Sequence, residues 1–354
     1  GQIVVIDSTF TGGDGAASAI ENDAGYLFVR NVTSSGYAST VRNQGVIVPG
    51  NSITEYVSDQ RFTLWNDTPA TSLNLPIVDL PFAPIDDPED TYVVDGDAQG
   101  DDTAAIQAAI DSGKTTVYLP LGDYTVSDTI RIRGNVRRLL GQQSTLVATQ
   151  ALRSSDKPVL LFEDGGAQPT VWIERLKSNF QASGRHTWIQ HNSSNDLVLR
   201  HVFIAYGKAY RNEGTGRLFM EDVAAGGANE VMEEVPAFIF KDQEVWAWQL
   251  NPEGCLPHII NDGGRLWVFG FKVGENHGPY FYTVNGGQTE LLGGVVNELT
   301  YDEPPADRAI LINDNSDTFA IFVERTRPGD ENPAPVVIRE RRDQEVRELL
   351  NGDV

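Results

Sequence analysis

Leu197-Val-Leu-Arg-His-Val202 decides the fold, because its six-residue pattern recurs along the chain. The pattern, which we call the hexad, reads apolar-x-apolar-(polar or aromatic)-x-apolar. It occurs at Leu27–Val32, Val171–Leu176, Leu197–Val202, Leu218–Val223, Val245–Leu250 and Leu266–Phe271. From residue 171 the copies start 26, 21, 27 and 21 residues apart, and looser copies follow at Thr289–Gly294 and Phe319–Glu324. Repeats at such a period are typical of a solenoid.

Each hexad is too short for a helix and alternates like a strand, with positions 1 and 3 facing inward. The return to an apolar residue at position 6 indicates a turn or bulge after position 4. Stacking the hexads about 4.8 Å apart would bury a continuous core. At position 4, Glu174, Arg200 and Glu221 alternate in sign, which favours in-register stacking. The sequence therefore predicts an all-β, right-handed parallel β-helix. An antiparallel sandwich, the alternative, would show hairpin dipeptides and shorter spacing.

Composition excludes several classes of function. Fifty acidic and 27 basic residues give a formal charge of −23, which disfavours nucleic acid and anionic lipid as partners. No apolar run reaches 18 residues, so we expect no membrane insertion. The single cysteine, Cys255, excludes an intramolecular disulfide. A soluble protein in an extracellular or cell-surface setting fits this balance.

The chain divides at a stretch rich in proline and acidic residues. We predict terminal coils of a preceding β-helix over 1–63, a linker over 64–94, the main β-helix over 95–330 and a capping tail over 331–354. Asp101, Asp102 and Thr103 predict the start of a capping helix near 102–111, with Ile106 and Ile110 on its apolar face. The mixed charges of 339–350 predict a short surface helix.

The stretch from Gly96 through Asp101-Asp-Thr103 to Ile106-Gln-Ala-Ala-Ile110, followed by Val117-Tyr-Leu-Pro120, resembles the opening of a pectate-lyase-superfamily β-helix. Leu121 departs from the usual proline or glycine. The predicted order of terminal coils, linker and a second, capped β-helix resembles the two-β-helix plan of the family 55 glycoside hydrolases, which are exo-β-1,3-glucanases. It also resembles uncharacterised bacterial relatives of that family. The resemblance implies that part of a first β-helix is missing, or that the chain associates with itself.

Hexad position 2 carries Trp172, Trp246 and Trp267 in one row that ends at Glu290, and Trp248 lies at position 4. A row of aromatic side chains is a platform for sugar rings. A carboxyl beside an indole is a candidate proton donor, so we expect Glu290 to be catalytic. The alternative is that a loop or a neighbouring unit covers the row and the tryptophans pack under it.

Two loops near the row carry further polar candidates. Asp262 and Glu275 are candidate bases, and His277 and Tyr280 are candidate ligands for sugar hydroxyls. Inverting hydrolysis needs two carboxyls about 6.5–9.5 Å apart, which neighbouring coils could provide. Ordinary turn chemistry is the alternative explanation of both loops.

The best-supported hypothesis from sequence is a β-helix that hydrolyses a β-glucan-like polysaccharide. The alternatives are a non-catalytic fibre or adhesin module that binds polysaccharide, and a lyase or tailspike-type depolymerase. For a lyase, Lys272, Arg265 and His201 are the candidate bases. We expect no cofactor and no catalytic metal; the acid-rich 86–102 region allows a structural Ca²⁺, although it lacks a recognised calcium loop.

Overall fold

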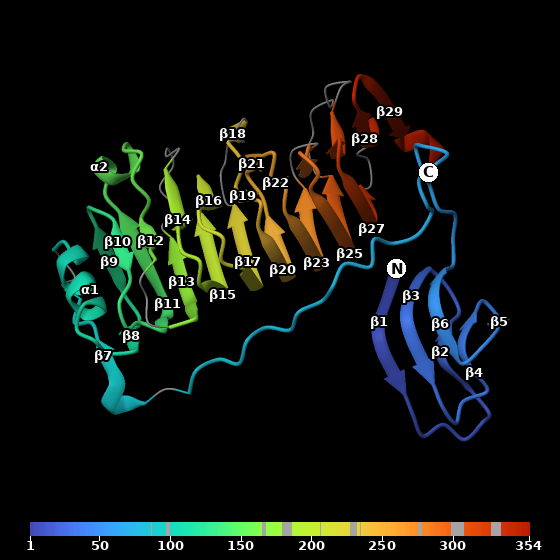
Figure 1. The fold of residues 1–354 in the computed structure, drawn as a ribbon, viewed down its shortest axis with the longest axis horizontal. Helices are drawn as coiled ribbons and strands as arrows, with labels where there is room; N and C mark the ends of the chain where they lie inside the picture. Colours follow the sequence, from blue (N-terminus) through green and yellow to red (C-terminus); the bar gives the residue numbers. More distant parts are fainter. Residues whose placement is uncertain are drawn as a thin grey trace.

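The computed structural model is a parallel β-solenoid of about 12 turns with very little helix, so the predicted fold class is confirmed. It describes residues 1–85, 87–96, 100–164, 168–178, 186–205, 207–226, 232–233, 235–274, 278–298, 308–326 and 334–354. Figure 1 shows the strands stacked side by side along the long axis of the molecule.

Two long sheets form the walls of the main solenoid. The eleven-stranded sheet contains β7 (Thr91–Val93), β8 (Thr116–Leu119), β9 (Asp123–Val126), β11 (Arg138–Ala148), β13 (Thr170–Ser178), β15 (Asp196–Ala205), β17 (Leu218–Gly226), β20 (Glu244–Pro252), β23 (Arg265–Gly274), β25 (Gln288–Glu298) and β27 (Asp317–Thr326). The ten-stranded sheet contains β10 (Ile130–Ile132), β12 (Leu160–Phe162), β14 (Thr187–His191), β16 (Lys208–Asn212), β19 (Phe238–Lys241), β22 (Ile259–Asp262), β24 (Phe281–Val284), β26 (Ala309–Asp314), β28 (Val336–Arg342) and β29 (Glu345–Leu350). A short pair, β18 (Met232–Glu233) and β21 (Cys255–Leu256), lies outside them.

The hexads from residue 171 onward occupy the eleven-stranded sheet in the predicted register, and the one at Leu27–Val32 lies in a separate three-stranded sheet. In β15, positions 1, 3 and 6 (Leu197, Leu199 and Val202) belong to the main core. Position 5 takes the left-handed conformation, with φ of 54° at Arg175 and 52° at His201. This residue turns the strand, so that position 6 points inward again. The bend predicted after position 4 is therefore confirmed.

The charges at position 4 also stack as predicted. Arg200 Nε lies 2.8 Å from Glu221 Oε2, and Arg200 Nη1 lies 3.9 Å from Glu174 Oε1. Arg138 of the preceding coil also pairs with Glu174. The Arg200–Glu221 pair is 34% exposed on both sides, and pairs of this kind typically contribute only about 0–1 kcal/mol, so it reports the register more than it stabilises it. Glu174 is buried, and the guanidiniums of Arg138 and Arg200 compensate its charge.

A short helix covers the first coil, as the sequence predicts. Helix α1 (Thr103–Ile110) buries Ile106, Ala109 and Ile110 on the core. The side chain of Asp101 accepts hydrogen bonds from Thr103 and Ser127, and these bonds lower the pKa of its carboxyl. The other helices are α2 (Gln150–Arg153), η1 (Pro88–Asp90) and η2 (Asn351–Asp353). Within the described ranges, every helix is too short or too polar to cross a membrane.

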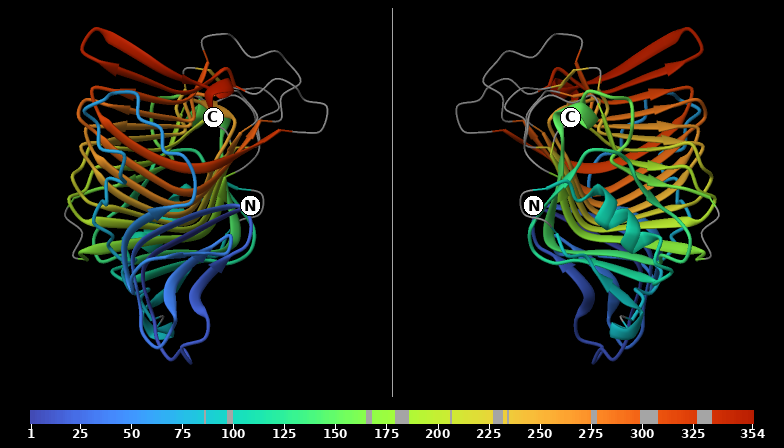
Figure 2. Two further views of the ribbon diagram at one scale, coloured as in Figure 1. Left: turned by 90° about the vertical axis from the view of Figure 1, so that its right-hand side faces the viewer. Right: turned by 90° about the vertical axis from the view of Figure 1, so that its left-hand side faces the viewer.

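The first 57 residues form a separate pair of coils, which we call the N-terminal unit. Its strands are β1 (Gln2–Phe10), β2 (Ser18–Asn22), β3 (Tyr26–Ser34), β4 (Ser39–Asn43), β5 (Val46–Val48) and β6 (Ser52–Val57). β1 pairs with β3 and β2 with β4, both in parallel, whereas β6 and β5 end the two small sheets by antiparallel pairing. The following linker runs back along the solenoid toward α1 (Figure 1). The end-on views show the N-terminal unit beside the solenoid (Figure 2).

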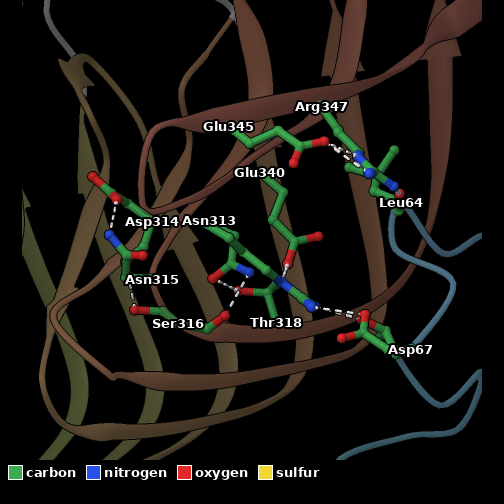
Figure 3. Close-up of polar contacts among 12 residues, drawn as sticks. Leu64, Asp67, Asn313, Asp314, Asn315, Ser316, Thr318, Glu340, Glu345 and Arg347 are labelled. Atoms are coloured by element: carbon green, nitrogen blue, oxygen red, sulfur yellow. Dashed lines mark hydrogen bonds and ion pairs between the residues drawn. The ribbon is translucent and has the colours of Figure 1, made fainter.

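The predicted C-terminal helix is wrong. Residues 336–350 form the antiparallel hairpin β28–β29, because β28 pairs with β26 and continues the ten-stranded sheet. The hairpin holds the start of the linker, where Arg347 donates to the Leu64 carbonyl and Arg342 pairs with Asp67 (Figure 3). The ring centroid of Trp65 lies 4.0 Å from the guanidinium carbon of Arg347 and 4.7 Å from that of Arg342. Tertiary pairing overrides the local helical pattern here.

The inward hexad positions allow a direct test of the fold. Leu199 is fully buried at position 3, whereas Leu121 keeps 71% of its surface exposed. We expect Leu199→Ala to lower the free energy of unfolding by about 2–5 kcal/mol, because it leaves a cavity between the stacked coils. Leu121→Ala is the matched control and should change it by less than about 0.5 kcal/mol. Urea titration followed by circular dichroism measures both, and equal effects would contradict the assigned register.

Candidate functional site

The large side chains at hexad position 2 form one row along the eleven-stranded sheet. In-register pairings connect Trp172 with Val198, Val198 with Phe219, Phe219 with Trp246, Trp246 with Trp267 and Trp267 with Glu290. The rings of Phe219 and Trp246 stack with centroids 5.2 Å apart. The predicted row therefore exists, and each member occupies one coil.

The row is not the open sugar platform that we expected. Trp172, Trp246 and Trp267 keep only 2%, 5% and 2% of their surface exposed. They form a hydrophobic cluster with Leu75 of the linker and Phe28 of the N-terminal unit. Trp246 Nε1 also donates to the carbonyl oxygen of Pro76, at 2.9 Å. The prediction of an open platform is wrong. Covering the indoles removes apolar surface of both the linker and the tryptophans from water, which lowers the free energy of the folded chain.

Glu290 lies under the same cover and has no exposed surface. Its Oε1 accepts hydrogen bonds from Arg30 Nη1 at 2.7 Å and from the Asn74 backbone N–H at 2.8 Å. Arg30, itself 2% exposed, also donates to Ser72 of the linker. A proton donor for hydrolysis must contact its substrate, and this carboxylate instead contacts the N-terminal unit and the linker. The geometry therefore does not support the catalytic role expected of Glu290.

The other predicted residues do not gather around Glu290. Asp262 ends β22 on the ten-stranded sheet, where it accepts a hydrogen bond from Asn285 at 2.6 Å. Tyr280 is fully buried against His258, and burial lowers the pKa of that histidine to about 3. Trp248 is partly exposed and contacts Trp267. Glu275 and His277 lie outside the described residues, so their roles stay predictions.

An open row of polar side chains occupies hexad position 5. We call it the polar row; its members at position 5 are Arg175, His201, Asp222 and Gln249, and Gln143, the last residue of a bulge over 141–143 opposite Arg175, extends the row into β11. His201 is partly exposed and the others are exposed. All five have a left-handed backbone, with φ between 52° and 62°. This conformation turns each side chain away from the core, so that five successive coils present one polar group each along the axis. The linker does not contribute to the lining of the hollow described next.

Gln142, Gln143, Arg175 and His201 line a surface hollow of about 240 Å³. Arg175 forms no ion pair within the part of the chain that the structure describes. An exposed, unpaired guanidinium presents five N–H donors in one plane. The hollow is therefore suited to ligands that are rich in hydroxyl or carboxylate oxygens.

His201 and Asp222 form a pair at one side of this hollow. Nδ1 of His201 lies 2.9 Å from Oδ2 of Asp222, and the two side chains are 34% and 60% exposed. A neutral histidine that donates its Nδ1–H to a carboxylate presents Nε2 as a proton acceptor. The pair therefore provides a base, and the neighbouring guanidinium of Arg175 provides a cation that can bind an oxygen of the ligand.

The described part of the acid-rich region before α1 uses its carboxylates for hydrogen bonds within the chain, and the structural Ca²⁺ allowed by the sequence stays a prediction. Asp90 and Asp101 accept hydrogen bonds from Thr115 and Ser127, and Asp102 accepts one from the Thr125 backbone. Among the described residues, no group of three His, Cys, Asp or Glu side chains is arranged to hold a metal ion. Asp86 and Asp97 lie outside the described residues.

Sequence reasoning named His201 only as one candidate base of a lyase and missed the rest of the polar row. The signal was nevertheless present, because position 5 is polar or glycine in the hexads from residue 171 to residue 294. A polar residue beside a turn is usually explained by turn chemistry. The sequence pattern does not reveal that this row is exposed to solvent, because its exposure depends on where the linker lies.

The Arg30–Glu290 ion pair should fix the N-terminal unit to the solenoid. We expect Arg30→Met to lower the free energy of unfolding by about 3–5 kcal/mol, because Glu290 would remain buried without its cation. Arg30→Met combined with Glu290→Met should recover most of that loss. Arg42→Ala is the control, since Arg42 is half exposed in a loose pair with Glu21. Urea titration and proteolysis of residues 71–80 measure the effects, and a single variant as harmless as the control would refute this role.

Comparison with known proteins supports the fold at the start of the solenoid. The family model for rhamnogalacturonase A/epimerase, pectate lyase-like, matches residues 90–167, which include α1 and the first coils. A search of the curated proteins found no match.

Two solved structures are similar to this chain. One is ORF18 of Geobacillus virus E2, with 16% identity and a TM-score of 0.39 over 71% of this chain and 60% of that chain. The other is the A-module of mannuronan C-5 epimerase AlgE6 from Azotobacter vinelandii, with 18% identity and a TM-score of 0.32 over 70% of this chain and 93% of that chain. The family model confirms the expected likeness to pectate-lyase-like β-helices over residues 90–167, and the relationship to family 55 stays a prediction.

Proposed function

We propose that this β-helix protein binds a polysaccharide at the polar row and modifies it there. The observation that carries the proposal is the open hollow in which Arg175 lies beside the His201–Asp222 pair. The pectate-lyase-like family model supports it, since its description names a rhamnogalacturonase and an epimerase. An extracellular or cell-surface location would bring the protein to such a substrate.

The chemistry of the row favours a glycan over other polymers. Glutamine amides, a guanidinium and a carboxylate can each donate to or accept from sugar hydroxyls. Nucleic acid is disfavoured by the formal charge of −23. The same charge should repel an acidic glycan at long range, so we expect moderate salt to strengthen its binding by screening this repulsion. At higher salt the attraction between the glycan and Arg175 is screened as well, and the binding should weaken again.

The reaction that fits these groups is proton abstraction from a uronate residue. Nε2 of His201 would take the proton from the carbon next to the carboxylate, and the electron pair left behind would spread onto that carboxylate, held by Arg175. Loss of the glycosidic oxygen at the next carbon, which would take a proton from water or from the protonated His201, would then give an unsaturated sugar. Return of a proton from water to the opposite face, with release of the abstracted proton from His201 to solvent, would instead give the epimer. Asp222 would stabilise the protonated imidazole in both cases.

Hydrolysis of a β-glucan receives less support. It requires a pair of carboxyls that meet the substrate, and Glu290 is covered by the linker. A non-catalytic binding module is the second candidate. It is favoured by one observation, namely that the aromatic row is used for packing against the linker and the N-terminal unit.

Substitutions at the polar row test the proposal. We expect Arg175→Ala and His201→Ala to weaken binding of the preferred polysaccharide by about three- to tenfold each, the value of one or two hydrogen bonds. His201→Ala should also abolish turnover, because it removes the base. Arg42→Ala is the matched control for an exposed arginine. The measurements are affinity electrophoresis on a panel of neutral and uronate-containing polysaccharides, detection of reducing ends and ultraviolet detection of unsaturated products, with proton NMR for epimers.

Each readout has a distinct meaning. Binding that depends on Arg175 without any turnover would assign the protein to the non-catalytic class. Reducing ends without unsaturated products, retained in His201→Ala, would show hydrolysis at another site. Unchanged binding in both variants would refute the polar row as the functional site.

A further inference from the structure

The polar row has a direction, and this direction restricts the shape of the glycan. Its side chains come from β11, β13, β15, β17 and β20, which are consecutive neighbours in the eleven-stranded sheet. Because neighbouring strands lie about 4.8 Å apart, the row extends about 19 Å along the axis. That spacing is close to the advance per sugar ring in an extended chain.

The positions on either side of the row differ from it in character. On one side lie the ion pairs of position 4, in which Arg200 pairs with Glu174 and Glu221. On the other side the strand turns inward at position 6, and Val202 and Val223 enter the core. The groups beside the row are therefore already paired with one another or buried, whereas the row itself continues along the axis.

The row ends at Gln249 on the side of the N-terminal unit. After Gln249, position 5 is glycine in the next two coils, at Gly270 and Gly293. A Cβ at Gly293 would lie 3.4 Å from Val4 of the N-terminal unit, so this unit closes the row at that end. Beside Gln249, the partly exposed ring of Trp248 offers an apolar surface for a terminal sugar.

We infer that a linear, extended glycan lies parallel to the solenoid axis, with one sugar ring beside each coil from Gln143 to Gln249. This inference rests on the proposed function. The ligand class is a ribbon-like chain, such as a β-1,4-linked glycan, whose rings keep pace with the coils. A coiled chain, such as a β-1,3-glucan, advances less per ring and would lose register after the first contacts.

Oligosaccharides of defined length test this placement. We would titrate the wild-type protein, by isothermal calorimetry, with β-1,4-linked glucose and uronate oligosaccharides of two to six residues and with β-1,3-linked glucose oligosaccharides of the same lengths. Affinity should rise with length up to four or five residues in the β-1,4 series and stay flat in the β-1,3 series. The reverse order, or equal affinity at every length, would overturn the inference.

Variants at the two ends separate this inference from the proposed function. Gln143→Ala and Gln249→Ala should weaken binding of the hexasaccharide by about three- to tenfold each while leaving the disaccharide unchanged. Gln44→Ala is the matched control, because Gln44 is also exposed with a left-handed backbone, at φ 47°, but belongs to the N-terminal unit.

If Arg175→Ala weakens binding and the end variants match Gln44→Ala, the site stands and the axial placement is refuted. If no oligosaccharide or polysaccharide binds, both proposals fail.

Discussion

In-register stacking of the hexads is the constraint on which the rest of this structure depends. A single strand of this length cannot bury its apolar face, whereas stacked copies bury positions 1, 3 and 6 in one continuous core. The left-handed residue at position 5 makes this arrangement possible, because it turns the strand between two inward-facing segments. Everything outside the core, including the aromatic row and the polar row, inherits the one-per-coil spacing of that stack.

Of the two outward-facing rows of the same sheet, one is buried and the other is exposed. The aromatic row at position 2 is covered by Leu75 and its neighbours in the linker, and by Phe28 of the N-terminal unit. The Arg30–Glu290 pair lies within this interface. Truncating either partner would leave a buried charge without compensation, so the pair specifies where the N-terminal unit sits. The polar row at position 5 remains accessible, and the functional proposal therefore moves from the tryptophans to Arg175, His201 and Asp222.

The cover itself is held at both ends. Arg342 and Arg347 of the C-terminal hairpin contact the ring of Trp65 where the linker begins. Asp90 accepts a hydrogen bond from Thr115 where the linker reaches the first coil. Between these points Trp246 and Glu290 bind the backbone at Pro76 and Asn74. The linker is thus a structural element of the solenoid, although it contains no strand over residues 58–85.

Local pattern was sufficient for the solenoid, the inward positions, the bend after position 4 and the capping helix, because each follows from contacts within a coil or between adjacent coils. Ile106, Leu199 and the Arg200–Glu221 pair illustrate this. Tertiary structure alone decided which outer row is buried, because residues 260 positions apart meet in the Arg30–Glu290 pair. It also turned 336–350 into a hairpin, since pairing with β28 satisfies the backbone groups at the edge of β26, which a surface helix would leave unpaired.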